Sequence, residues 1–134
     1  MPLLIDTSLW VDFVRPKSPE SVKKFIAPYI LRADAHLAEP VIFEILKHAT
    51  PAESRQLTLQ FQTFPTLPTP PDLWTSAARL GQECRKNGVT AGSLDLLIAT
   101  VALHHDAEIV TFDADFQKIA GFSALKVKLL RAPP

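Results

Sequence analysis

Short apolar runs alternate along this chain with longer stretches in which apolar residues recur every three or four positions. Residues 3–5 and 108–112 are short, apolar and rich in branched side chains, which is typical of buried strands. In the segment that opens at Ser18, apolar residues stand at offsets 0, 3, 4 and 7, which form one face of a helix. Strands that alternate with helices predict an α/β domain with a mostly parallel sheet.

The same patterns give approximate bounds for the other elements. We expect helices over residues 8–14, from Ser18 onward, over 40–49, 51–64 and 72–86, after a capping Ser93, and a short one opened by Asp113. The expected strands cover residues 3–5, 35–38, 108–112 and 125–130, and the extended segment 65–71 brings the sheet to about five. Because 134 residues is the length of one domain, we expect residues 1–134 to form a single domain.

Composition narrows the class of protein. Hydrophobic residues make up 47% of the chain and charged residues 21%, which is close to the globular average and argues against intrinsic disorder. The apolar runs are too short for a transmembrane helix, and the N-terminus lacks the basic start of a secretory signal. Cys84 stands alone, which excludes an internal disulfide and a cysteine-based zinc site, so we expect a cytoplasmic protein.

Charge is balanced over the whole chain but not along it. There are 14 basic and 14 acidic residues, so the global positive charge of a DNA-coating protein is missing. No acid follows Asp115, whereas four basic residues do: Lys118, Lys126, Lys128 and Arg131. This tail is interpreted either as a solvated end or as a local contact for nucleic acid.

Two acids follow strands directly. Asp6 comes after the first predicted strand and Asp113 after the strand at 108–112. In a parallel sheet both would project from the same edge. Each is also a good N-cap for the next helix, and that alternative stays open.

Two further acids lie on helices. Glu44 is surrounded by apolar neighbours, and a buried carboxylate needs a basic partner, a proton or a cation. Asp95 lies in a first helical turn, where it either interacts with the helix dipole or, with small Ala99 and Ala102 on its face, looks into a crevice.

If these acids meet at one rim, their repulsion requires a cation. Oxygen ligands alone favour Mg²⁺ or Mn²⁺, which activate water and neutralise phosphate charge, so the pattern predicts hydrolysis of a phosphodiester or a phosphomonoester. The four histidines have no metal-ligand spacing and are interpreted as surface residues: His36, His48, His104 and His105.

Four segments, in order, resemble the motifs of the PIN-domain ribonucleases, and within them the VapC-type toxins of toxin–antitoxin pairs. The segments are 4–10 with Asp6, 40–46 with Glu44, 88–103 with Asp95, and 107–120 with Asp113. The resemblance covers nearly the whole chain. It departs from the family at His48, where many members carry glycine, and Asp115 competes with Asp113 for the fourth acid.

The resemblance implies a three-layer α/β/α domain and a Mg²⁺- or Mn²⁺-dependent endoribonuclease that cleaves tRNA, rRNA or mRNA. It implies a homodimer, and a cognate antitoxin whose tail fills the active-site groove. The implied metal-binding and catalytic residues are Asp6, Glu44, Asp95 and Asp113, supported by Ser8, Thr111 and Asp115. Nearness to the motifs suggests phosphate contacts from Arg15, Lys47 and Lys118.

Two alternatives come from other classes. Residues 109–115 resemble the strand and Asp-x-Asp motif of haloacid-dehalogenase-type phosphatases, although that motif opens the chain in those enzymes. The other alternative is a non-catalytic module that binds RNA or a protein, in which the acids are only helix caps.

Overall fold

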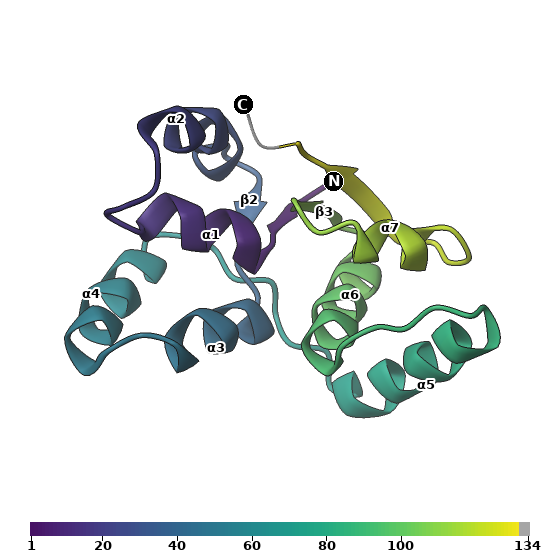
Figure 1. Cartoon of the computed structure of the whole chain (residues 1–134). Helices are drawn as coiled ribbons and strands as arrows, with labels where there is room; N and C mark the ends of the chain where they lie inside the picture. Colours follow the sequence, from purple (N-terminus) through teal and green to yellow (C-terminus); the bar gives the residue numbers. More distant parts are fainter. Residues whose placement is uncertain (132–134) are drawn as a thin grey trace.

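The sheet is parallel throughout and its strands pair in the order β2-β1-β3-β4 (Figure 1). The computed structural model describes residues 1–131. In chain order the elements are β1 (Leu3–Ile5), α1 (Thr7–Val14), α2 (Glu20–Ile30), β2 (Ala35–His36), α3 (Glu39–Lys47), α4 (Pro51–Phe61), α5 (Leu73–Lys86), α6 (Ser93–His105), β3 (Glu108–Thr111), α7 (Asp115–Ala120) and β4 (Lys126–Leu129). The expected α/β class is confirmed.

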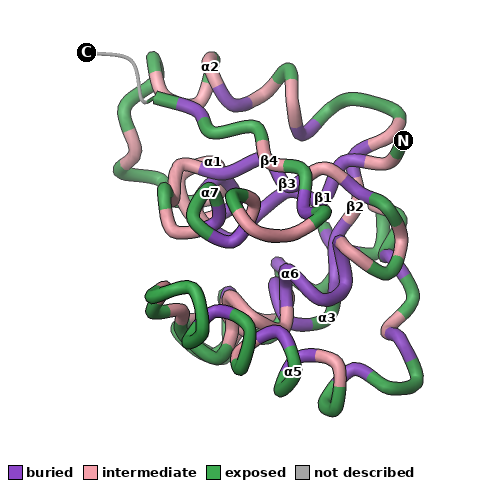
Figure 2. The backbone as a smooth tube through the Cα atoms, turned by 90° about the vertical axis from the view of Figure 1, so that its right-hand side faces the viewer, coloured by how far each residue is buried: buried purple, intermediate pink, exposed green. Residues whose placement is uncertain are grey.

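Helices cover both faces of the sheet. Figure 2 shows α2 on one side of the strands and α3, α5 and α6 on the other, which gives three layers. The central strands β1 and β3 are buried on both faces, with Leu4, Ile5, Ile109 and Val110 fully inaccessible. This explains why their sequences are continuous apolar runs and not alternating ones.

The second strand is shorter than its pattern predicts. β2 ends at His36, and Leu37 instead forms an isolated parallel bridge with Thr66. Leu37 N donates to Pro65 O at 2.8 Å, and Leu67 N donates to Leu37 O at 2.8 Å. The segment at 65–71, expected to be extended, therefore runs beside the end of β2.

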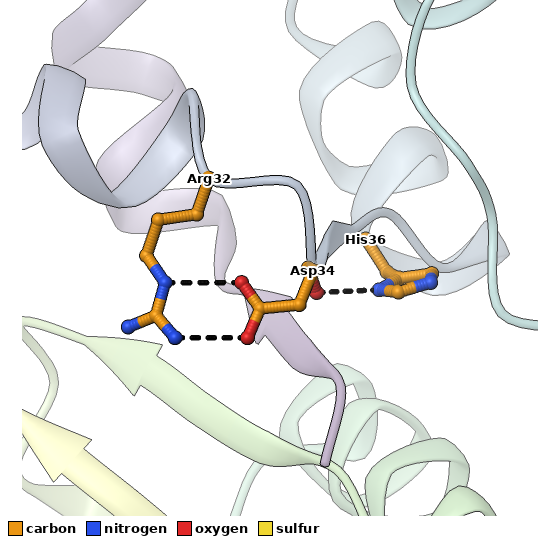
Figure 3. Close-up of polar contacts among 3 residues, drawn as sticks. All are labelled: Arg32, Asp34 and His36. Atoms are coloured by element: carbon orange, nitrogen blue, oxygen red, sulfur yellow. Dashed lines mark hydrogen bonds and ion pairs between the residues drawn. The ribbon is translucent and has the colours of Figure 1, made fainter.

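The turn before β2 is fixed at the amino end of the sheet. Arg32 Nε and Nη2 donate to the two carboxylate oxygens of Asp34 at 3.0 and 2.9 Å, and His36 Nδ1 lies 2.7 Å from Asp34 O (Figure 3). The same carbonyl accepts a hydrogen bond from Leu3 N at 2.9 Å. Because Leu3 begins β1, this polar group lies at the edge opposite the carboxyl ends of the strands.

The last strand forms one edge of the sheet. Within residues 1–131, β4 pairs only with β3, from Glu108↔Lys126 to Thr111↔Leu129. Lys126 and Lys128 are exposed on it, and Lys126 Nζ forms an ion pair with Asp106 at 2.6 Å. The basic end of the chain thus includes an edge strand.

Two helices begin differently from the sequence prediction. Ser93 is the first residue of α6 and not its cap; Gly92 is the N-cap, and no side chain caps this helix. The last short helix begins at Asp115, two residues after Asp113. Asp113 still serves the helix start, because its Oδ1 accepts from Asp115 N at 2.9 Å.

Trp10 links the end of β1 to the helices beside it. Its side chain is buried, and Nε1 donates to Ile5 O at 3.2 Å. The indole also packs edge-on against Phe61 and Phe64, with ring centroids 5.8 and 4.9 Å away. One side chain therefore fixes α1 and α4 against the strand that leads to Asp6.

We expect Trp10→Phe to lower the free energy of unfolding by roughly 2 kcal/mol, because it removes a buried donor and leaves space between two rings. Chemical denaturation followed by circular dichroism measures this. The exposed Trp74 provides the control, since Trp74→Phe should leave the free energy of unfolding within about 0.5 kcal/mol of the wild-type value. Equal effects at both positions would contradict the packing described for Trp10.

Candidate metal centre

Asp6 lies at the junction of β1 and α1, where the chain leaves the carboxyl edge of the sheet. It is the N-cap of α1, and its Oδ2 accepts from Ser8 N at 3.4 Å. The side chain is only 4% exposed. The capping role and a role in a site are thus compatible, because the cap holds the carboxylate at the strand end.

Two hydroxyl groups fix the same carboxylate. Ser8 Oγ donates to Asp6 Oδ2 at 2.9 Å, and Thr111 Oγ1 donates to it at 2.8 Å. Thr111 Oγ1 in turn accepts from Asp113 N at 2.9 Å, and Ser8 Oγ accepts from Phe112 N at 3.2 Å. This network joins the ends of β1 and β3, which pair in register at Ile5↔Val110.

Three acids gather beside this junction. Oxygen atoms of Asp95, Asp113 and Asp115 lie within 4.8 Å of one another. Asp95 comes from the first turn of α6, and the other two follow β3. The Asp-x-Asp segment therefore has a third carboxylate from a different element beside it.

A cavity of about 320 Å³ connects the four predicted acids. Asp6, Glu44, Asp95 and Asp113 all line it. Glu44 is half-buried on α3, whereas its neighbour Phe43 is 57% exposed. One apolar neighbour of Glu44 is therefore exposed, because one face of α3 is turned to solvent.

Asp95 is the electrostatic centre of this group. Its pKa is raised to about 6 by burial and by the negative charges of Asp113, Asp6, Glu44 and Asp115, in that order. Burial also raises the pKa of Asp6, although the hydrogen bonds from Thr111 and Ser8 oppose the shift. The folded protein thus holds the carboxyl groups of Asp6 and Asp95 in conditions that disfavour their ionisation.

The three predicted basic contacts are placed differently. Arg15, at the end of α1, lines the cavity. Lys118 Nζ forms an ion pair with Asp115 Oδ1 at 3.3 Å, so it stands next to the acids. Lys47 is not among the residues that line the cavity, and its ammonium group lies 6.0 Å from the centre of the Phe43 ring.

Of the four histidines and the cysteine, only His48 lines the acidic cavity among the residues that the structure describes. His48 is exposed at the end of α3, as expected for a surface residue, and it also lines the acidic cavity, at the position where the sequence departs from the family's glycine. His36, His104 and His105 are not among the cavity residues. Cys84 is buried, and its burial raises the pKa of the thiol, which fits a packing residue of α5.

The side chains fit a hard divalent cation. The donors are carboxylate oxygens, and their mutual repulsion falls when a cation lies between them. In addition, Thr7 Oγ1 is buried without a hydrogen-bond partner within residues 1–131, and Thr7 lines the same cavity. A cation with its water ligands would satisfy both the charges and this hydroxyl group.

The fold and the acids together define a class: an α/β domain with a carboxylate cluster at the carboxyl edge of a parallel sheet. Comparison with known families makes this specific, because the sequence model of the PIN domain matches residues 3–122. The chain belongs to the PIN-domain family. The haloacid-dehalogenase alternative is not favoured, since the match spans Asp6, Glu44 and Asp95 as well as the Asp-x-Asp segment.

Curated relatives cover almost the whole chain. "VapC ribonuclease Mb1587" of Mycobacterium bovis is 32% identical over 136 residues, which cover 96% of this chain and 99% of that protein. "Ribonuclease VapC11" of Mycobacterium tuberculosis matches to the same extent, at 32% identity over 96% of this chain and 99% of that protein.

Solved structures share the fold at lower identity. VapBC2 from Rickettsia felis, crystallised with a DNA fragment from its promoter, matches with a TM-score of 0.74 at 17% identity, over 98% of this chain and 100% of that one. VapBC-1 from nontypeable Haemophilus influenzae gives 0.71 at 19% identity, over 96% and 98%. Within residues 1–131, no helix combines the length and apolar character needed to cross a membrane.

The raised pKa of Asp95 predicts a pH-dependent stability in the absence of metal. The folded state keeps a proton up to about pH 6 that the unfolded state releases near 3.8, so the contribution of Asp95 to stability falls as the pH rises through this window. We expect Asp95→Asn to remove this fall. Above pH 6 the variant should be more stable than the wild type by about 1 kcal/mol, a small value because the half-buried side chain is partly screened by water.

Denaturation curves with a chelator at several pH values measure the difference. Asp106→Asn is a matched control at the opposite end of α6, where the residue adopts a positive φ of 52° that asparagine accepts. Its pH profile should follow the wild type. Parallel profiles for Asp95→Asn and the wild type would show that the pKa of Asp95 is not raised in the folded state.

Proposed function

We propose that this chain is a divalent-metal-dependent endoribonuclease, with Mg²⁺ or Mn²⁺ as its metal, and that it is the toxin of a toxin–antitoxin pair. The observation that carries the proposal is the meeting of Asp6, Glu44, Asp95 and Asp113 around one cavity. The ribonuclease names of the mycobacterial relatives support the choice of RNA as substrate.

In this proposal the four cavity acids hold the cation and are the catalytic residues. When bound, a hard divalent cation lowers the pKa of a water molecule and neutralises charge on the phosphate. Ser8 and Thr111 keep the Asp6 carboxylate oriented through their bonds to Oδ2. Asp115 adds negative charge beside Asp95 and Asp113.

The same acids would repel an RNA backbone, so basic contacts are part of the proposal. Arg15 is the best placed because it lines the cavity, and its guanidinium would bind a phosphate. Lys118 would bind near Asp115, with which it already pairs. Lys47 lies on the Phe43 side of α3 and would contact RNA only outside the cavity.

We also propose that the chain acts in the cytoplasm, on tRNA, rRNA or mRNA as its substrate. Two protein partners are part of the proposal: a cognate antitoxin, and a second copy of this chain in a homodimer. The antitoxin proposal is supported by the solved VapBC proteins, whose names pair a VapB with a VapC. An antitoxin with a basic side chain would neutralise the cavity acids in place of the cation.

Incubation of the purified chain with total RNA tests the activity. We expect discrete cuts with Mg²⁺ or Mn²⁺, and none with a chelator. Asp95→Asn should lower the rate by about a hundredfold or more, because it removes a charged ligand from the centre of the cluster. Asp106→Asn should cleave at the wild-type rate.

Calorimetry with Mn²⁺ separates the remaining alternatives. Binding without any RNA cleavage would contradict the nuclease proposal, and the absence of both would favour a non-catalytic module. Hydrolysis of a small phosphomonoester with RNA left intact would favour a phosphatase.

The antitoxin proposal has its own test. We expect the product of a small gene adjacent to this one to form a stable complex with the chain and to suppress RNA cleavage at equimolar concentration. Titration of the cleavage reaction measures this effect. Full cleavage in the presence of a stable complex would contradict blockage of the cavity.

A further inference from the structure

His48 is a side chain of the acidic cavity that the proposed cation-binding group does not use. It lines the cavity together with Glu44 and Arg15. The carboxylate oxygens that lie within 4.8 Å of one another come from Asp95, Asp113 and Asp115, and no nitrogen of His48 belongs to that group. His48 thus stands at the wall of the cavity and outside the cluster.

The helix geometry explains this position. Successive residues of an α-helix are rotated by about 100°, so a residue four positions after Glu44 lies about 40° away on the same face. His48 is the C-cap of α3 and keeps a helical backbone, with φ −100° and ψ −2°. It therefore falls on the Ile45 side of Glu44, and Ile45 also lines the cavity.

The imidazole of His48 has no partner within residues 1–131, in contrast to two other histidines. His36 Nδ1 lies 2.7 Å from Asp34 O, and His105 Nε2 lies 2.6 Å from Pro68 O. His48 is exposed, and the ion pairs of the described chain do not include one between it and Glu44. Its N–H group is therefore available to a ligand at the cavity.

The charge of the cavity indicates which ligand the His48 N–H group would bind. Of the residues that the structure describes, four acids line the cavity, and Arg15 is the one permanently charged cation that lines it. These carboxylates repel a phosphate, so hydrogen-bond donors at the wall of the cavity favour its binding. An imidazole carries at least one N–H in either protonation state, and His48 presents it at the mouth of the site.

We propose that His48 donates a hydrogen bond to a backbone phosphate of RNA bound at this cavity, on the wall formed by the end of α3. This inference rests on the proposed function, since it takes RNA as the substrate. His48 is then a substrate-binding residue: it contributes to KM, and it is dispensable for holding the cation.

The test compares His48→Ala, His48→Gln and the matched control His104→Ala. His104 is also an exposed histidine at the end of a helix, and it lies nine residues along α6 from Asp95, about 13 Å along the helix axis. We expect His48→Ala to raise KM for RNA cleavage about tenfold, with kcat changed less than about threefold. His48→Gln should recover part of this loss because its amide supplies an N–H donor.

Two further measurements keep the inference separate from the proposed function. Calorimetry should give the wild-type affinity for Mn²⁺ in His48→Ala. Binding of a labelled pool of single-stranded RNA oligonucleotides is measured in the Asp95→Asn background, in which cleavage is slow. The affinity should weaken about tenfold on addition of His48→Ala and stay within twofold for His104→Ala.

The outcomes are distinct. A wild-type chain that cleaves RNA, together with a His48→Ala variant of unchanged KM and unchanged RNA affinity, overturns this inference and leaves the proposed function intact. Loss of Mn²⁺ binding in His48→Ala also overturns it, since the residue would then belong to the cation site. A third outcome is that the wild-type chain binds RNA without cleaving it and that His48→Ala weakens this binding. That outcome supports the inference and contradicts the nuclease proposal.

Discussion

Repulsion between like charges is the constraint around which this molecule is organised. Two carboxylates about 5 Å apart oppose each other by about 3 kcal/mol at an effective dielectric constant near 20, and three acids lie at such distances here. The acids come from the ends of two strands and from two helices, so packing elsewhere in the fold must keep them together. The apolar strands β1 and β3 supply that packing, because both are buried on their two faces.

The hydroxyl network at the strand ends has a different role from the acids. Ser8 and Thr111 both donate to Asp6 Oδ2, which orients the carboxylate and partly offsets the cost of its burial. They also receive backbone N–H groups from the segment after β3. The network thus fixes the backbone at Asp113 relative to the Asp6 carboxylate.

Much of this arrangement could be predicted from the chain. The apolar runs predicted as strands at 3–5 and 108–112 form β1 and β3, the latter ending at Thr111, and a parallel sheet alone brings Asp6 and Asp113 to one edge. The spacing of apolar residues was less informative about ends and faces. β2 is short because Leu37 bonds to the segment at Pro65, and such a long-range contact leaves no local pattern.

The face of a helix near its end was the hardest feature to predict. Lys47 and His48 are adjacent, yet one lies toward Phe43 and the other lines the cavity. Nearness in sequence to Glu44 does not separate them, because the exposure of Phe43 is decided by which side of α3 meets the rest of the protein. The role of each acid in catalysis stays a prediction that requires measurement.

The lysines on β4 have a consequence for how this protein behaves at high concentration. An open strand edge offers unpaired backbone groups to a neighbouring molecule, and flat apolar edges are common starting points for fibrils. Lys128 places positive charge on this edge, so two copies that approach through it repel each other, whereas the charge of Lys126 is balanced by its ion pair with Asp106. The parallel sheet is thereby discouraged from extending from molecule to molecule, even though the chain as a whole carries no net charge to keep copies apart.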